Sequence, residues 1–138
     1  MVGQYIRLTA VSTDSLGGTT SHTSAGSQIS NVDDAATGTL AFVGDDQEGG
    51  ILFADTTTIL DADGSLTFAY QWQSSSDNNA WSDIVAASGF DYIIASDQSM
   101  VGQYTSPKAD STDLHDAIPI HTSAGSQISN VDDAATGT

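Results

Sequence analysis

A short acidic turn is the clearest place in this sequence where side chains could do chemistry. Asp61 and Asp63 are separated by one residue, and Gly64 follows them. Two carboxylates at this spacing can point at one ion, and the glycine permits the sharp bend that calcium loops need. Trp72 stands where an EF-hand would need its final Glu, which excludes that motif. The spacing predicts a metal site, although a plain Asp–Gly turn would look the same.

A second acidic loop carries three acids between glycines. Asp45, Asp46 and Glu48 lie within residues 44–50, and no Lys or Arg is close in sequence. Bringing these carboxylates together without a cation would cost free energy, so the loop is a second candidate metal site. The alternative is a flexible, solvated loop.

A third acidic segment, Asn31-Val32-Asp33-Asp34, recurs as residues 130–133. A cation bound there would turn a loose joint between two modules into a rigid one, whereas the alternative is a polar linker. The predicted metal ligands are Asn31, Asp33, Asp34, Asp45, Asp46, Glu48, Asp61 and Asp63, with Asp14 and Asp97 as weaker candidates.

The composition supports a metal but does not require one. The 138 residues include 2 Lys+Arg and 18 Asp+Glu, for a net charge of −16, and every acid except Glu48 is Asp. Aspartate is a poor helix former that prefers turns, so the sequence predicts acidic turns. Such turns repel one another unless a cation lies among them, and calcium prefers oxygen ligands from flexible loops. The alternative is a charged surface that keeps a sheet protein soluble.

Several functions are disfavoured by the composition. There is no Cys, which removes disulfides and thiolate metal sites. Arg7 and Lys108 are the only permanent cations, so nucleic acid is not an expected partner. No long apolar run or cleavable leader is present, so we expect no membrane insertion. His22, His115 and His121 lack zinc spacing and no nucleophile motif is present, so we expect surface histidines and no enzyme.

A long internal repeat organises the chain. Residues 1–39 (copy one) return as residues 100–138 (copy two), an offset of 99. Both copies open on MVGQY and close on HTSAGSQISNVDDAATGT. This period fits a tandem array of β-sandwich modules better than a solenoid.

The middle of copy two differs from that of copy one. Ile6 and Leu8 alternate with polar residues as in a half-buried strand, but Thr105 and Pro107 stand at the matching positions. Proline lacks the N–H that a central strand donates, so we expect Thr105–Ile120 to lie off the main sheet. Identical flanks around a rewritten middle favour a permuted, frame-shifted or engineered order over a divergent terminal repeat.

Strand patterns separated by turn residues fill the region between the copies. They are Leu40–Val43, Ile51–Ala54, Leu66–Gln73, Trp81–Val85 and Tyr92–Ala95, and copy one adds Val2–Val11 and roughly 19–32. In Leu66–Gln73, alternation puts Phe68, Tyr70 and Trp72 on one face. We expect an all-β, immunoglobulin-like Greek-key β-sandwich of about seven strands in circularly permuted order. Residues 1–34 would supply its last strands, 35–104 the remainder, and 105–138 a strand-broken tail.

Spaced residues throughout the module carry a family resemblance. They are Tyr70–Gln73, Trp81, Ile84, Tyr92, Val101–Tyr104 or its counterpart Val2–Leu8, and Asn31–Thr39. In this order they resemble the bacterial immunoglobulin-like extender repeats of giant RTX adhesins, the ice-binding adhesins among them. Ala36 stands where those junctions usually have proline. The resemblance implies no catalysis. It implies spacer modules, stiffened by calcium, that hold an adhesive tip away from a bacterial cell surface.

We therefore expect a non-catalytic, extracellular extender module that calcium folds and rigidifies. Its expected partners are neighbouring repeats, and copy one could also donate its strand to another chain. The alternative is a calcium-dependent glycan- or peptide-binding module in which Trp81, Phe90 and Tyr92 form a stacking face, although large aromatic residues more often form a sandwich core.

Overall fold

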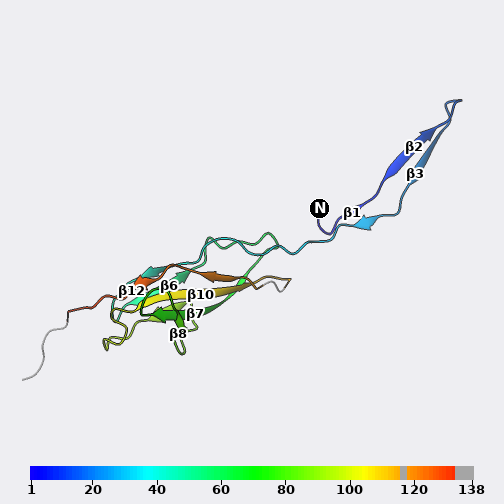
Figure 1. Cartoon of the computed structure of the whole chain (residues 1–138). Coiled ribbons are helices and arrows are strands. Elements are labelled where there is room, and N and C mark those ends of the chain that lie inside the picture. Colours follow the sequence, from blue (N-terminus) through cyan, green and yellow to red (C-terminus); the bar gives the residue numbers. More distant parts are fainter. Residues whose placement is uncertain (116–117, 133–138) are drawn as a thin grey trace, which may run out of the picture. The chain divides into compact units, whose positions relative to one another are not determined.

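The structure is a computed structural model that describes residues 1–115 and 118–132. Its regular elements in these ranges are all strands, which confirms the all-β class. A helix long and apolar enough to cross a membrane does not occur in the described residues. The chain divides into two compact units, Met1–Asp33 (unit 1) and Asp34–Thr138 (unit 2) (Figure 1).

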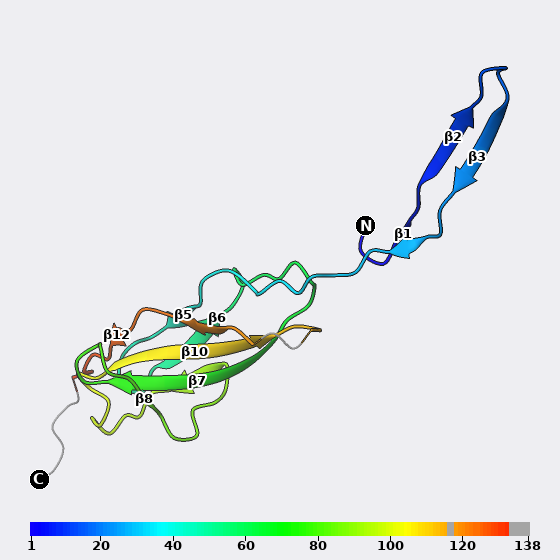
Figure 2. The ribbon, with the colours of Figure 1, turned by 45° about the vertical axis from the view of Figure 1, so that its right-hand side comes forward.

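Unit 1 is a long hairpin built from copy one. Its strands are β1 (Tyr5–Ile6), β2 (Thr9–Thr13), β3 (Thr19–Thr23) and β4 (Ser27–Gln28). β2 pairs with β3 and β1 pairs with β4, both antiparallel (Figure 2). Asp14 closes the turn, because its Oδ1 accepts the backbone N–H groups of Leu16 at 2.9 Å and Gly18 at 2.8 Å. All strand residues of this hairpin are exposed.

The larger sheet of unit 2 is centred on two long strands. β7 (Thr67–Ser75) and β10 (Tyr104–Thr112) pair antiparallel along their whole lengths. The remaining strands are β8 (Ser82–Asp83) beside β7, and β11 (Ile120–Thr122) and β12 (Ser126–Gln127) beside β10. Copy two therefore supplies three of the strands of this sheet.

A three-stranded sheet packs against the larger one. It has the order β5 (Ala41–Gly44), β6 (Ile51–Asp55), β9 (Asp91–Ile93). Trp72 of β7 is fully buried between the sheets, with the rings of Phe42 and Tyr92 each 5.8 Å away. Leu52, Ile94 and Ile128 complete this cluster. Phe68 and Tyr70 pack against a second buried cluster, which is formed by Ala36, Leu40, Ile59 and Ala109. The arrangement is sandwich-like, as expected; the Greek-key connection stays a prediction.

Our prediction of which copy supplies strands to the sandwich was wrong. We predicted that copy one would complete the sheet and that Thr105–Ile120 would lie outside it. Instead β10 is a central strand between β7 and the β11–β12 edge, and the strands of copy one pair only with one another in the described residues. The sandwich thus closes on copy two, without the permuted order.

Pro107 is tolerated because the ladder needs no N–H at its position. It lies opposite Trp72, whose backbone N–H and C=O bond to Ala87 and Ile84 on the far side of β7. Since neighbouring antiparallel pairs alternate between bonded and non-bonded, the backbone of Pro107 faces the other edge of β10.

On that edge, copy one shows what proline removes. The N–H of Leu8, the counterpart of Pro107, donates to the side-chain Oγ of Ser24 at 3.0 Å, and not to a strand carbonyl. In copy two the Ser106 hydroxyl donates instead to the backbone C=O of Ser123 at 3.0 Å. Proline at this position therefore removes one hydrogen bond to a side chain and no backbone hydrogen bond between strands.

Candidate metal site

The Asp61–Gly64 turn leads into β7 and orients its own carboxylates. The Oδ1 atom of Asp61 accepts the backbone N–H of Asp63 at 2.6 Å. Gly64 has φ of +121°, in the region that favours glycine. The turn therefore forms as the sequence predicts, with both carboxyl groups half-buried.

A third carboxylate, from Asp113, joins this pair. Asp113 follows β10, and the pairing of Thr112 with Thr67 brings the end of β10 beside the start of β7. Carboxylate oxygens of Asp61, Asp63 and Asp113 lie within 4.8 Å of one another. The Asp113 side chain is buried, and its Oδ1 accepts the backbone N–H of His115 at 2.7 Å.

The charge of this triad is what makes it a candidate cation site. Two unit charges 4.8 Å apart repel by about 3.5 kcal/mol at an effective dielectric constant near 20. The Oδ2 atom of Asp61 is shielded from solvent and accepts no hydrogen bond from the described residues. An acceptor in that position costs free energy unless a cation or a donor reaches it. Carboxylate oxygens from flexible turns are the ligands that calcium prefers.

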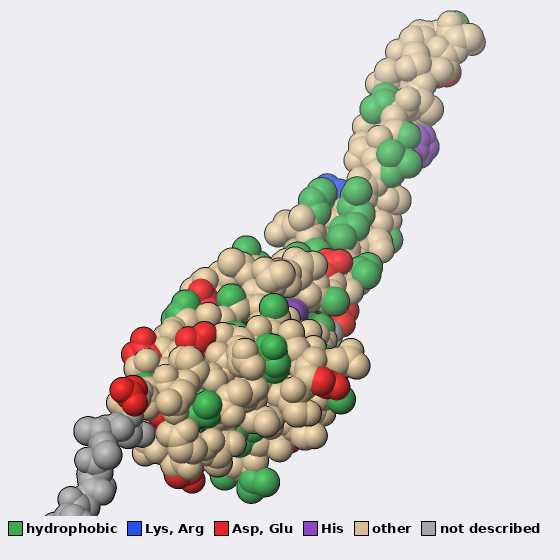
Figure 3. Space-filling view, turned by 60° about the vertical axis from the view of Figure 1, so that its left-hand side comes forward, with side chains coloured by type: hydrophobic (Ala, Val, Ile, Leu, Met, Phe, Trp, Pro, Cys, Tyr) green, Lys and Arg blue, Asp and Glu red, His purple; other side chains and the backbone are tan. Residues whose placement is uncertain are grey.

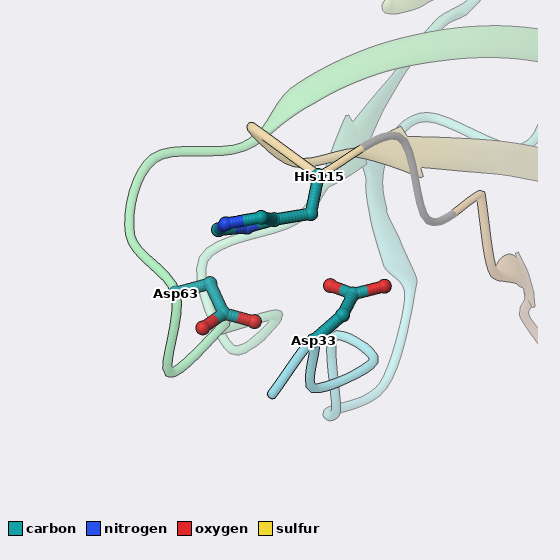
Figure 4. A group of neighbouring side chains, drawn as sticks. All are labelled: Asp33, Asp63 and His115. Carbon is teal, nitrogen blue, oxygen red and sulfur yellow. The ribbon is translucent and has the colours of Figure 1, made fainter. Parts of the chain in front are cut away.

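The first residue of unit 2 is tied to the same place. The backbone N–H of Asp34 donates to Oδ2 of Asp63 at 2.7 Å. Figure 4 shows the side chains of Asp63 and His115, one from the loop before β7 and the other from the loop after β10, at the same end of unit 2. The His115 and His22 side chains are exposed, as the sequence predicts, but the same prediction was wrong for His121, which is buried on β11.

Asp113 was not among the predicted ligands, although the repeat contains the signal. Asp14 is its counterpart in copy one and was named as a weaker candidate. The two aspartates make the same turn, because each Oδ1 accepts the N–H two residues on, from Leu16 or His115. Since Thr105–Ile120 was expected to lie off the sheet, nothing indicated that Asp113 would reach β7.

Two acids of the 44–50 loop, Asp46 and Glu48, make hydrogen bonds near the end of the described chain. Glu48 is buried, and its carboxylate accepts the backbone N–H of Val131 at 2.8 Å and the Nε2 of Gln98 at 2.7 Å. Asp46 accepts a hydrogen bond from the Ser126 hydroxyl, and Asp45 is exposed. Within residues 1–115 and 118–132 these three acids form no common metal-binding group. Asp46 therefore holds β12, and Glu48 holds the segment after it.

The remaining predicted ligands fall outside the triad. Asn31 and Asp33 belong to unit 1, which ends at Asp33, and Asp34 contributes its backbone N–H to Asp63. In the second junction Asp132 is exposed, and Asp133 lies outside the described residues.

Three other aspartates act as turn caps. The pKa of Asp55 is lowered by hydrogen bonds from the side chain and backbone of Thr57, and that of Asp97 by the same two groups of Ser99. The pKa of Asp77 is lowered first by the backbone N–H of Ala80. These hydrogen bonds stabilise the charged form of each carboxyl group within its own turn. Figure 3 likewise shows acidic side chains at several separate places on unit 2.

The aromatic residues considered for glycan stacking do not gather on one face. Tyr92 stacks on Trp72 in the core. Trp81 packs over Gly125, and Phe90 lies beside Phe53 with ring centroids 6.0 Å apart.

Comparisons with protein-family models, with curated proteins and with solved structures gave no match.

Proposed function

We propose that this chain is a non-catalytic extender module of a bacterial surface adhesin, folded and stiffened by calcium. The observation that carries the proposal is the carboxylate triad of Asp61, Asp63 and Asp113, which joins the two central strands at one end of the sandwich. A cation there would bind the folded module and not the open chain, so it would stabilise the fold. At about 100 times its Kd, one site adds roughly 2.7 kcal/mol.

The two junctions support a spacer role. At one end of unit 2, Asp34 donates its N–H to Asp63, and in the segment that leaves the unit Val131 donates its N–H to Glu48. Val131 is the counterpart of Val32, which precedes Asp34 by two residues. In a tandem array, each junction would then be held by Glu48 of one module and Asp63 of the next, with a very short free link. The extracellular location follows from the family resemblance and belongs to the proposal.

Calorimetric titration with calcium tests the proposal, together with melting curves in calcium and in chelator. We expect binding in the purified chain and a higher Tm with calcium. Asp113→Asn should weaken binding at least tenfold and remove much of the Tm difference, since it removes one charge from the triad. Asp14→Asn is the matched control, because it changes the equivalent turn in unit 1. Equal Tm values in calcium and chelator would rule the proposal out.

A further inference from the structure

The two hairpins of this chain are built in one register. In copy one Tyr5 pairs with Gln28, and Ala10 pairs with His22. Shifted by 99 residues, these become the pairs Tyr104–Gln127 and Ala109–His121 of copy two. Unit 1 therefore has the pairing of β10 with β11 and β12, but without β7.

In copy two, pairing with β7 accompanies burial of one face of the hairpin. The inner-face residues of β10 are Thr105, Pro107, Ala109 and Ser111, and all four are buried almost completely. In copy one the first two counterparts are Ile6, which is 51% exposed, and Leu8, which is 71% exposed. The outer backbone edge of Tyr5–Thr13 also has no strand partner among the described residues. An apolar, unpaired strand edge is a template for pairing with another chain.

Copy one carries the more apolar inner face of the two. At the position opposite Trp72, copy two has Pro107 and copy one has Leu8. Two residues earlier, opposite Ser74, copy two has Thr105 and copy one has Ile6. Because burial of apolar surface favours association, the Tyr5–Thr13 strand offers β7 more apolar surface than its own partner does.

Copy one cannot reach the β7 of its own chain without undoing unit 2. In the β10 position, its end at Val32 would lie where Val131 lies, next to Glu48 beyond the Ser75 end of β7. Asp34, two residues later, is held by Asp63 beyond the Thr67 end. Two residues span about 7 Å at most. The nine residues of β7 extend over roughly 27 Å.

We propose that the Tyr5–Thr13 edge of one molecule pairs with β7 of a second copy of this chain, in place of that copy's β10. Each molecule offers one such edge and one β7, so the contact is head to tail and forms either closed rings or open chains. At low concentration β10 keeps its place, because it is tethered to β7 in the same molecule. This proposal does not depend on calcium or on the adhesin function.

Light scattering on the full-length protein over a wide concentration range tests the exchange. We expect a mass of one chain, 14.2 kDa, when dilute and of two or more chains when concentrated. Leu8→Lys should abolish the association, because the lysine would be buried against Trp72. Leu16→Lys is the control: Leu16 is 96% exposed at the hairpin turn, so its replacement should change nothing.

A second variant uses a disulfide between β7 and β10 to prevent β7 from accepting a strand of another molecule. Ser74 and Thr105 are direct partners on β7 and β10, and the chain has no other cysteine to compete if both are replaced by Cys. The oxidised double variant should stay a single chain, and reduction should restore association. A constant mass of 14.2 kDa for the unmodified protein at every concentration would overturn the proposal. Association that persists in Leu8→Lys or in the oxidised variant would overturn it as well.

Discussion

Ser111 and His121 lie on adjacent strands of unit 2 with Oγ and Nε2 2.9 Å apart, and Ser12 and His22 repeat this relationship at 3.0 Å in unit 1. The first pair is buried and the second is exposed. We expect Ser111→Ala to cost about 1–3 kcal/mol of unfolding free energy, since it leaves a buried ring nitrogen without this partner.

Ser12→Ala is the matched control for that change. The same substitution at an exposed pair should stay within about 0.5 kcal/mol. Urea unfolding followed by circular dichroism measures both variants. Equal losses would mean that the pair contributes through the local hairpin and not through burial.

The repeat offers a second matched pair at its glycines. A Cβ at Gly125 would lie 2.5 Å from the ring of Trp81, whereas at Gly26 its nearest neighbour would be the Cβ of Tyr5 at 3.8 Å. Gly125→Ala should therefore destabilise unit 2 by about 1–3 kcal/mol through overpacking, and Gly26→Ala should be nearly neutral. Tryptophan fluorescence during unfolding reports on unit 2. A neutral Gly125→Ala would contradict the packing of Trp81 over this strand.

Glu48 should control how firmly the chain after β12 is held. The two carboxylate oxygens of Glu48 accept hydrogen bonds from Val131 and Gln98. Glu48→Gln removes the charge and replaces one of these acceptor oxygens by an NH₂ donor, so one of the two bonds is lost. We expect a loss of about 1–3 kcal/mol and faster hydrogen exchange at the Val131 amide. Asp45→Asn, at an exposed position of the same loop, should leave that amide unchanged.

Tyr92 should make the fold sensitive to alkali. Burial, and then the charge of Asp97, raises the pKa of this phenol above its ordinary 10.0. The unfolded chain therefore loses the proton first. The stability contribution is complete below pH 10.0 and declines as pH rises above it. Urea midpoints on either side of this pH should fall with alkali in the unmodified protein. The decline should be smaller in Tyr92→Phe, and an unchanged decline would contradict this assignment.

The sequence predicted the apolar framework of unit 2 well. Alternation in Leu66–Gln73 matches β7, and Trp72, on the predicted apolar face of that strand, lies in the core. This succeeds because a strand that buries one face must alternate along the chain. The Asp61–Gly64 turn was also predicted, since an Asp–Gly turn is defined by its own residues.

The prediction failed at β10, where tertiary hydrogen bonds stabilise a central strand that lacks the usual alternation of apolar residues. β10 buries Thr105 and Ser111 on its inner face, and their hydroxyls bond to the carbonyl of Gln73 and the ring of His121. Polar residues whose hydrogen bonds are made can occupy a core position without an apolar pattern. The error at β10 also hid Asp113, because a residue reaches the triad only if its strand pairs with β7.

Residues near Gln47 and Ser129 run in the same direction, unlike the antiparallel strand pairs of the sheets. Three bonds hold them: Ser129 donates to the Asp46 carbonyl, the Glu48 N–H donates to the Ser129 carbonyl, and Val131 donates to the Glu48 carboxylate. Tension applied between the two ends of unit 2 would slide these parallel segments past each other. The three bonds would then share the load and break together, which would give the unit mechanical strength along its axis.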